Sequence, residues 1–329
     1  MNCESTLNYE NNKNDTQAGI NIFHYNDNLG RGINMGNALE APNEGEWDVK
    51  IEKEYFSIIK DAGFSNIRIP IRWSVHTADE APYNINHTFI NRVDWVIGNA
   101  LANDLKIIIN IHHFEAIMEQ PSQEKEKFFS LWRQISQHYK DFSMDICFEI
   151  LNEPHDKLTP QLWNQYLVEA LNIIRASNPE RPVIIGTANW GGITALSELE
   201  LPDDENIIFT FHYYEPFHFT HQGAEWNEGS EAWLGTSWEA NDSEVNDIVE
   251  DFNLVENWAN NNEIPVFLGE FGAYSKANST SRQLWTKSVR EEAEKRNFSW
   301  AYWEFCSGFG AYDDQSNKWR RYLIEALIE

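Results

Sequence analysis

Two glutamates in this sequence each follow a short apolar segment, and they are the residues best placed to do chemistry. Glu153 follows residues 146–151 and precedes Pro154, which cannot donate to a β-ladder. Glu270 follows residues 265–269, a second apolar segment. Two carboxyl groups can cleave a glycosidic bond, because the reaction needs an acid at the leaving oxygen and a carboxylate near the anomeric carbon. We therefore predict that Glu153 and Glu270 face each other across a groove.

The segments that carry these glutamates belong to a longer alternation of strand-like and helix-like patterns. Strands are expected at 32–37, 67–71, 106–111, 146–151, 182–187, 207–211, 265–268 and 299–303. Apolar residues at helical spacing predict helices near 51–62, 89–101, 128–139, 163–174, 245–261, 281–296 and 317–328, with a short one within 191–199. Eight such units favour an α/β fold, a single-domain (β/α)8 TIM barrel.

An open doubly wound sheet is the alternative fold. Gly30, Gly32 and Gly36 do not match the G-x-G-x-x-G spacing of a dinucleotide-binding turn, so the barrel is preferred. Residues 1–20 are mostly polar and are expected to be a mobile lead-in to a catalytic barrel domain at 21–329. Residues 1–17 lack the apolar core of a signal peptide.

The composition limits the partners of this protein. Lys and Arg number 25 against 52 Asp and Glu, and the resulting charge of −27 would repel nucleic acid and anionic membranes. No apolar run is long enough to insert into a bilayer. Cys3, Cys147 and Cys306 are far apart and predict neither a disulfide framework nor a metal site. Cys3 could be the remnant of a lipidated bacterial N-terminus, although a stray cysteine in the tail is the preferred interpretation.

Active sites of such barrels lie at the carboxyl ends of the strands, and the residues expected there are polar or aromatic. In the glycosidase hypothesis Glu270 is an ionised nucleophile, kept charged by Arg68 and Tyr214. Glu153 is the protonated acid, which acts as a base in the second step. Asn152 could bind the sugar hydroxyl beside the reacting carbon. The alternative is that either glutamate is an ordinary solvated residue at the start of a loop.

Histidines and tryptophans at the strand ends have competing interpretations. His112 and His113 would point to opposite faces of a strand, so a single metal ion could hardly bind both, and a role in binding sugar is preferred over metal binding or a structural role. The same alternatives apply to His212. Trp303 and Trp226 are expected to stack on sugar rings, whereas tryptophans on predicted helices are expected to pack in the core. Trp226 belongs to a long loop, about 214–241, whose length favours function.

Six motifs resemble glycoside hydrolase family 5, the cellulase family A. They are Asn-Ile-Arg-Ile-Pro at 66–70, Ile-Asn-Ile-His-His at 109–113, Glu-Ile-Leu-Asn-Glu-Pro at 149–154, Phe-His-Tyr-Tyr at 211–214, Leu-Gly-Glu-Phe-Gly at 268–272 and Tyr-Trp-Glu-Phe at 302–305. The resemblance covers about residues 30–328. It implies a barrel with Glu153 as acid/base and Glu270 as nucleophile, and with a catalytic shell completed by Arg68, His113, Asn152, His212, Tyr214 and Trp303, with His112 close by.

Segments 36–40 and 220–226 resemble a branch of thermophile-type members that accept both glucan and mannan. That resemblance implies substrate contacts from Asn37, Glu40, His221 and Trp226. Residues 227–242 follow no recognised pattern.

The sequence therefore predicts a retaining endo-β-1,4-glucanase, without cofactor or metal, that acts as a monomer on β-1,4-linked polysaccharide or oligosaccharide. An endo-β-1,4-mannanase, a dual glucanase/mannanase or a xyloglucanase is the alternative within the same class. A non-catalytic carbohydrate-binding barrel and a metal-dependent hydrolase are alternatives of other classes. A secreted or cell-surface bacterial location is expected.

Overall fold

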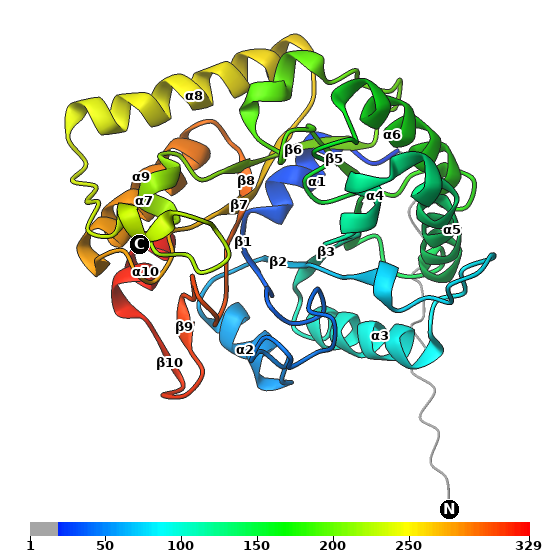
Figure 1. Cartoon of the computed structure of the whole chain (residues 1–329), viewed down its shortest axis with the longest axis horizontal. Coiled ribbons are helices and arrows are strands. Elements are labelled where there is room, and N and C mark those ends of the chain that lie inside the picture. The colour runs from blue at the N-terminus through cyan, green and yellow to red at the C-terminus, as the bar shows by residue number, and fades with distance from the viewer. Residues whose placement is uncertain (1–18) are drawn as a thin grey trace, which may run out of the picture.

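Eight parallel strands form a closed barrel in the computed structural model, which describes residues 19–329 (Figure 1). The strands are β1 (Arg31–Asn34), β2 (Asn66–Ile69), β3 (Lys106–Asn110), β4 (Ile146–Glu149), β5 (Val183–Gly186), β6 (Ile207–Tyr213), β7 (Val266–Phe271) and β8 (Ser299–Tyr302). Each pairs with the next along the chain, and β1 pairs with β8 to close the ring. The predicted (β/α)8 barrel is confirmed.

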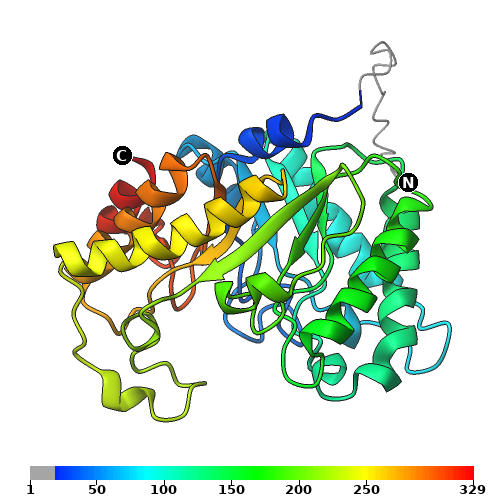
Figure 2. The same ribbon diagram turned by 90° about the horizontal axis from the view of Figure 1, so that it is seen from above.

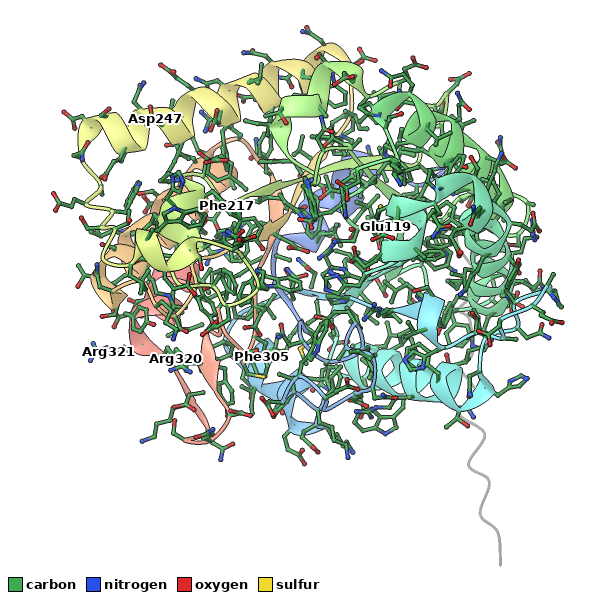
Figure 3. All side chains as sticks on the ribbon, viewed as in Figure 1. Glu119, Phe217, Asp247, Phe305, Arg320 and Arg321 are labelled. Atoms are coloured by element: carbon green, nitrogen blue, oxygen red, sulfur yellow. The ribbon has the colours of Figure 1, made fainter. Side chains whose placement is uncertain are left out.

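Helices surround the barrel and bury one apolar face against it. They are α2 (Glu54–Asp61), α3 (His87–Leu101), α4 (Glu115–Glu119), α5 (Pro121–Tyr139), α6 (Pro160–Arg175), α8 (Asp242–Asn261), α9 (Ser279–Lys295) and α10 (Arg321–Ile328). Charged side chains cover their outer faces, as for Asp247 on α8 and Arg321 on α10 (Figure 3). This arrangement follows from the helical spacing of apolar residues.

Several short elements differ from the expected pattern. The helix expected within 191–199 is a 3₁₀ helix, η2 (Ile193–Glu198). The last helix begins at Arg321 rather than 317, because β10 (Lys318–Trp319) pairs with β9 (Tyr312–Asp313) in a hairpin. Three further short helices lie in loops: η1 (Trp73–Val75), α7 (Phe217–Thr220) and η3 (Ser230–Trp233).

An additional helix, α1 (Ile22–Leu29), closes the amino-terminal end of the barrel, and the sequence pattern did not predict it. Its Asn26 donates to the carbonyl of Val266 at 3.0 Å and accepts from Ser299 Oγ at 2.7 Å, at the starts of β7 and β8. Figure 2 shows α1 at one end of the barrel and the loop after β6 at the opposite end. Residues 1–18 of the expected lead-in lie outside the described residues.

The interior of the barrel changes from apolar to polar along the strands. Near α1 it is filled by an apolar layer formed by Ile108, Cys147, Ile184, Ile208, Phe267 and Ala301. Two residues further along β3 and β4, the inward positions are Asn110 and Glu149. Successive inward residues of a strand are two positions apart, so the same strands that bury an apolar layer also present polar groups above it. This polar layer is the floor of the site.

Candidate active site

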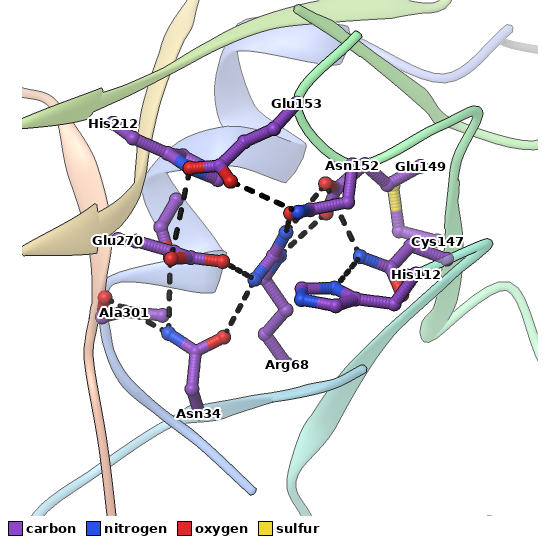
Figure 4. Close-up of polar contacts among 12 residues, drawn as sticks. Asn34, Arg68, His112, Cys147, Glu149, Asn152, Glu153, His212, Glu270 and Ala301 are labelled. Carbon is purple, nitrogen blue, oxygen red and sulfur yellow. Dashed lines mark hydrogen bonds and ion pairs between the residues drawn. The ribbon is translucent and has the colours of Figure 1, made fainter. Parts of the chain in front are cut away.

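Arg68 on β2 is the centre of the polar layer and has no solvent exposure (Figure 4). Its guanidinium binds Glu149 through two bonds of 2.6 Å, and it donates to Glu270 at 2.6 Å, Asn152 at 2.7 Å and Asn34 at 2.9 Å. These five bonds use all five N–H groups of the side chain. Arg68 therefore fixes groups from β1, β4 and β7 relative to one another.

Glu153 and Glu270 meet above this floor, with His212 between them. His212 Nδ1 lies 2.7 Å from Glu153 Oε1 and 3.6 Å from Glu270 Oε2. An oxygen of each glutamate and a ring nitrogen of His212 all lie within 4.8 Å of one another. Carboxyl groups about 5–5.5 Å apart are typical of retaining glycosidases, whereas inverting enzymes separate them by about 6.5–9.5 Å. The separation of Glu153 and Glu270 is therefore that of a retaining glycosidase.

The two glutamates differ in exposure and in partners. The Glu270 side chain is 6% exposed and accepts from Arg68 Nη1 and from Tyr214 Oη, the latter at 2.9 Å. The Glu153 side chain is 22% exposed and also accepts from Asn152 Nδ2 at 3.4 Å. Glu270 is thus held in a fixed position, while Glu153 stays accessible to a leaving group or water.

Burial and charge shift the pKa values of this cluster in different directions. Burial raises the pKa of Glu270, against the opposing effects of His212 and Arg68. Burial also acts to raise the pKa of Glu153, but the hydrogen bond and charge of His212 outweigh it and lower that pKa. The pKa of His212 is raised: burial opposes this, but the charges of Glu270 and Glu153 prevail. In the ligand-free site these directions are opposite to those expected for an ionised Glu270 and a protonated Glu153, so the roles of the two glutamates rest on their positions and exposure.

Several residues at the ends of the strands adopt left-handed backbone conformations. The φ angles are 63° at Asn37, 49° at His113, 46° at Glu153, 55° at Asn189 and 63° at Trp190. Non-glycine residues rarely adopt positive φ, and such strain concentrates at functional sites. Here it redirects side chains where the chain leaves the barrel.

Aromatic rings line the rim of the site. Trp303 follows β8 and lies parallel to His112, with ring centroids 5.8 Å apart and planes 7° apart. Trp303 and Tyr214 pack against a cluster formed by Ala224, Tyr274 and Phe309. Trp226, in the loop after β6, is 62% exposed and contacts Tyr274 at 4.9 Å. Trp226 is exposed and Trp303 is half-buried, and neighbouring rings support both, as sugar stacking requires.

The predicted geometry of His112 and His113 is wrong. Strand β3 ends at Asn110, and the two rings lie edge to face with centroids 4.6 Å apart rather than on opposite faces. His112 is buried and hydrogen-bonded to Asn110 at 3.0 Å, and burial holds its pKa well below the usual value. His113 lies nearer the rim, with its Nδ1 atom 3.5 Å from Glu115 Oε1.

Glu40 is also placed differently from the expectation. Its side chain has no exposure, and its carboxylate accepts from the backbone amides of Asn37 and Ala38, which contradicts a direct contact with substrate. Glu40 therefore shapes the loop that carries Asn37. Asn37 itself is half-buried at the rim. His221 is largely buried between two aromatic rings, with ring centroids 4.0 Å from Phe217 and 4.9 Å from Tyr214. Burial lowers the pKa of His221 to about 4.

Four residues of the site were not assigned a role from the sequence. Asn34, Asn110 and Glu149 complete the polar layer around Arg68, and Trp190 forms an exposed rim surface beside Glu153. A signal for Glu149 was available, because a charged residue inside the apolar segment 146–151 must find a buried partner.

The cluster of Glu153, His212 and Glu270 brings three possible metal ligands together. These atoms already form hydrogen bonds, however: His212 Nδ1 is hydrogen-bonded to Glu153, and Glu270 is hydrogen-bonded to Arg68. The buried charge of Arg68 next to Glu270 would repel a cation. These contacts fit a pair of catalytic carboxyl groups better than a metal centre.

Fold and site together define a hydrolase of glycosidic bonds. The family model described as cellulase (glycosyl hydrolase family 5) matches residues 17–308. The chain belongs to glycosyl hydrolase family 5.

Several known bacterial proteins are similar to this chain. Endoglucanase H of Acetivibrio thermocellus is 37% identical over 87% of this chain, which spans only 30% of the length of that relative. Endoglucanase A of Ruminococcus albus is 31% identical, with 91% of this chain and 89% of that protein covered. The solved structure of Thermotoga maritima Cel5A with mannotriose is 54% identical, with a TM-score of 0.92, and covers 93% of this chain and 100% of Cel5A. Cel5A has also been solved with cellobiose.

Proposed function

We propose that this protein is a retaining endo-β-1,4-glucanase. The observation that carries the proposal is the approach of Glu153 and Glu270 within 4.8 Å over a floor held by Arg68. This separation leaves room for a glycosidic bond between the two carboxyl groups but not for an additional water molecule.

In the first step Glu270 attacks the anomeric carbon and the glycosidic C–O bond breaks. The electron pair of that bond stays with the leaving oxygen, which takes the proton supplied by Glu153. Arg68 and Tyr214 hold Glu270 in place for the attack, and His212 Nδ1 lies 2.7 Å from Glu153 Oε1, close enough to exchange a proton with it. The product is a glycosyl ester on Glu270 and a free sugar end.

In the second step a water molecule attacks the same carbon from the side that the leaving group vacated. Glu153, now ionised, takes a proton from the water, and the ester bond to Glu270 breaks. Esterification has removed the charge of Glu270, which weakens the repulsion between the two groups and favours the ionised Glu153 that this step requires. Two displacements restore the original configuration.

Glucan is the first proposed substrate and mannan the second. The similar proteins of the previous section are endoglucanases, and the structures of Cel5A hold cellobiose and mannotriose. Trp190 after β5 and Trp226 after β6 are both exposed, and two such rings suit stacking of an extended sugar chain and hence cleavage within the polymer. Xyloglucan is a further candidate.

The proposed location is outside the bacterial cell or on its surface, because polymeric β-glucans are too large to enter. Action as a monomer is part of this proposal. Within residues 19–329 no helix is both long enough and apolar enough to cross a membrane.

A reducing-sugar assay on barley β-glucan, carboxymethylcellulose, glucomannan, galactomannan, xylan and xyloglucan tests this proposal. The expected result is release of reducing ends from β-glucan and glucomannan, with a rapid fall in viscosity, and loss of both in the Glu270→Ala variant with an unchanged fold. Turnover of β-glucan by that variant near the wild-type rate would rule out the proposed role of Glu270.

A further inference from the structure

His155 lies directly below the rim on the side of Glu153, and none of the steps above uses it. It is 5% exposed and follows Glu153 by two residues. Its Nδ1 atom lies 2.5 Å from the backbone carbonyl oxygen of Glu153. A carbonyl oxygen can only accept, so Nδ1 carries a proton and donates it to this bond. This bond holds the peptide of a residue whose φ angle is 46°.

The other side of the His155 ring supports Trp190. The two rings are stacked, with centroids 3.4 Å apart and planes 12° apart. The backbone amide of Trp190 also donates to the carbonyl of Pro154 at 3.2 Å. Trp190 is 56% exposed, so its opposite face is open to a ligand. One imidazole thus touches both the backbone of the acid/base glutamate and the back of an exposed aromatic surface.

The remaining nitrogen of His155 faces two carboxylates. Nε2 lies 3.8 Å from Glu115 at the start of α4 and 3.9 Å from Asp156. These distances are too long for hydrogen bonds, so the ring is oriented by its Nδ1 bond to Glu153 and by the stacked Trp190. His155 is therefore held by the segments that follow β4 and β5, with Nε2 facing Glu115 after β3.

From these contacts we infer that His155 is a positioning residue that sets both the acid/base carboxyl of Glu153 and the plane of Trp190 on the leaving-group side. The inference rests on the proposed function. Groups next to the proton donor lie beside the departing sugar, because the donor must reach the leaving oxygen. The hydrogen bond and the ring have separable effects: the bond acts on proton transfer, and the ring acts on binding of the departing portion of the glycan.

Two variants separate these effects. His155→Phe keeps a flat ring behind Trp190 but removes the hydrogen bond, whereas His155→Asn keeps a donor near Nδ1 but removes the ring. Each variant is assayed on cellotetraose, whose sugar leaving group needs a proton, and on 2,4-dinitrophenyl β-cellobioside, whose leaving group does not. Wild-type turnover is measured first, so failure of the proposed function appears as an inactive wild type.

For His155→Phe we expect kcat on cellotetraose to fall about 10–100-fold, while the initial release of dinitrophenolate changes by less than about twofold. For His155→Asn we expect KM for cellotetraose to rise about 2–10-fold with little change in kcat. His138→Phe is the matched control, because His138 also contacts a carboxylate, Asp94 at 3.0 Å, but lies on the outer helix α5. His138→Phe should leave the kinetics on both substrates unchanged.

Equal losses on both substrates in His155→Phe would indicate a merely structural role and overturn the inference. Wild-type kinetics in both variants would also overturn the inference. If His155→Phe does not fold by circular dichroism, His155→Asn decides alone: an unchanged KM for cellotetraose contradicts the inference.

Discussion

The Arg68 Nη1 atom donates to Glu270 Oε1 at 2.6 Å, which joins residues 202 positions apart in the chain across the interior of the barrel. Arg68 belongs to β2 and Glu270 to β7, and these strands are not neighbours in the sheet. Because Arg68 also forms two hydrogen bonds to Glu149, its positive charge is shared between Glu149 and the proposed nucleophile Glu270. The charge that Glu270 experiences therefore depends on Glu149.

Glu149→Gln tests this sharing of charge. Loss of one partner of a buried ion pair typically costs about 3–5 kcal/mol, so the free energy of unfolding should fall by about that amount. Arg68 would then act more strongly on Glu270 and lower its pKa, and the acidic limb of the pH–rate profile should move to lower pH. Urea denaturation and the pH dependence of kcat/KM measure the two effects.

The control for Glu149→Gln is Glu126→Gln. Glu126 also pairs with an arginine, Arg133, but on the exposed face of α5, where such a pair contributes about 0–1 kcal/mol. An acidic limb that stays in place in Glu149→Gln would show that Glu149 does not influence Glu270.

Glu153→Gln should separate the two chemical steps. Loss of a general acid typically costs about 10²–10⁴-fold, so we expect kcat on cellotetraose to fall by that factor. Dinitrophenyl cellobioside needs no proton for its leaving group, so its first step should remain fast, while the second step slows without a base. A burst of dinitrophenolate followed by slow turnover is the expected stopped-flow trace. A slow first step with no burst would contradict the role of Glu153.

The fold and the proximity of Glu153 and Glu270 could be predicted because both depend on local patterns. Each strand is a short apolar segment, and Glu153 and Glu270 directly follow two of them, so the closed barrel brings them to one end. The loop after β3 was predicted wrongly because the strand ends two residues before His112, and strand alternation no longer applies there.

Contacts across the barrel could not be read from the sequence. The bonds from Arg68 to Asn34 and Glu149 depend on the relative register of β1, β2 and β4, which no local pattern specifies. Helix α1 was missed because it has only 8 residues and because the polar Asn26 takes one of its buried positions, against the start of β7. The burial of Glu40 depends on a loop conformation that periodicity does not describe.

Two buried carboxyl groups near the rim should make stability depend on pH. Burial raises the pKa of Glu40 and of Glu304 to about 7 each, from 4.5. The folded state then binds more protons than the unfolded state between pH 4.5 and 7, so the free energy of unfolding should fall as pH rises through this window. The difference of 2.5 pH units corresponds to about 3 kcal/mol for each group.

Urea denaturation of the wild type and of Glu40→Gln between pH 4.5 and 8 measures this effect. The variant should lose the part of the slope that belongs to Glu40, whatever its absolute stability. Parallel curves for the two proteins would show that Glu40 titrates near its ordinary pKa.

Removal of metal ions should leave activity unchanged. Dialysis against EDTA, followed by the reducing-sugar assay on barley β-glucan, should give the activity of the untreated enzyme, because the proposed catalytic carboxylates are held by Arg68, His212 and Tyr214. Loss of activity that Zn²⁺ or Ca²⁺ restores would favour a metal-dependent hydrolase.

The central claim is that Glu270 attacks the sugar while Glu153 moves the proton. Incubation with 2,4-dinitrophenyl 2-deoxy-2-fluoro-β-cellobioside, followed by peptic digestion and mass spectrometry, tests it most directly, because the fluorine slows breakdown of the glycosyl ester. The account predicts one fluorocellobiosyl group per chain on the peptide that contains Glu270. A label on Glu153, Glu149 or any other residue would contradict it.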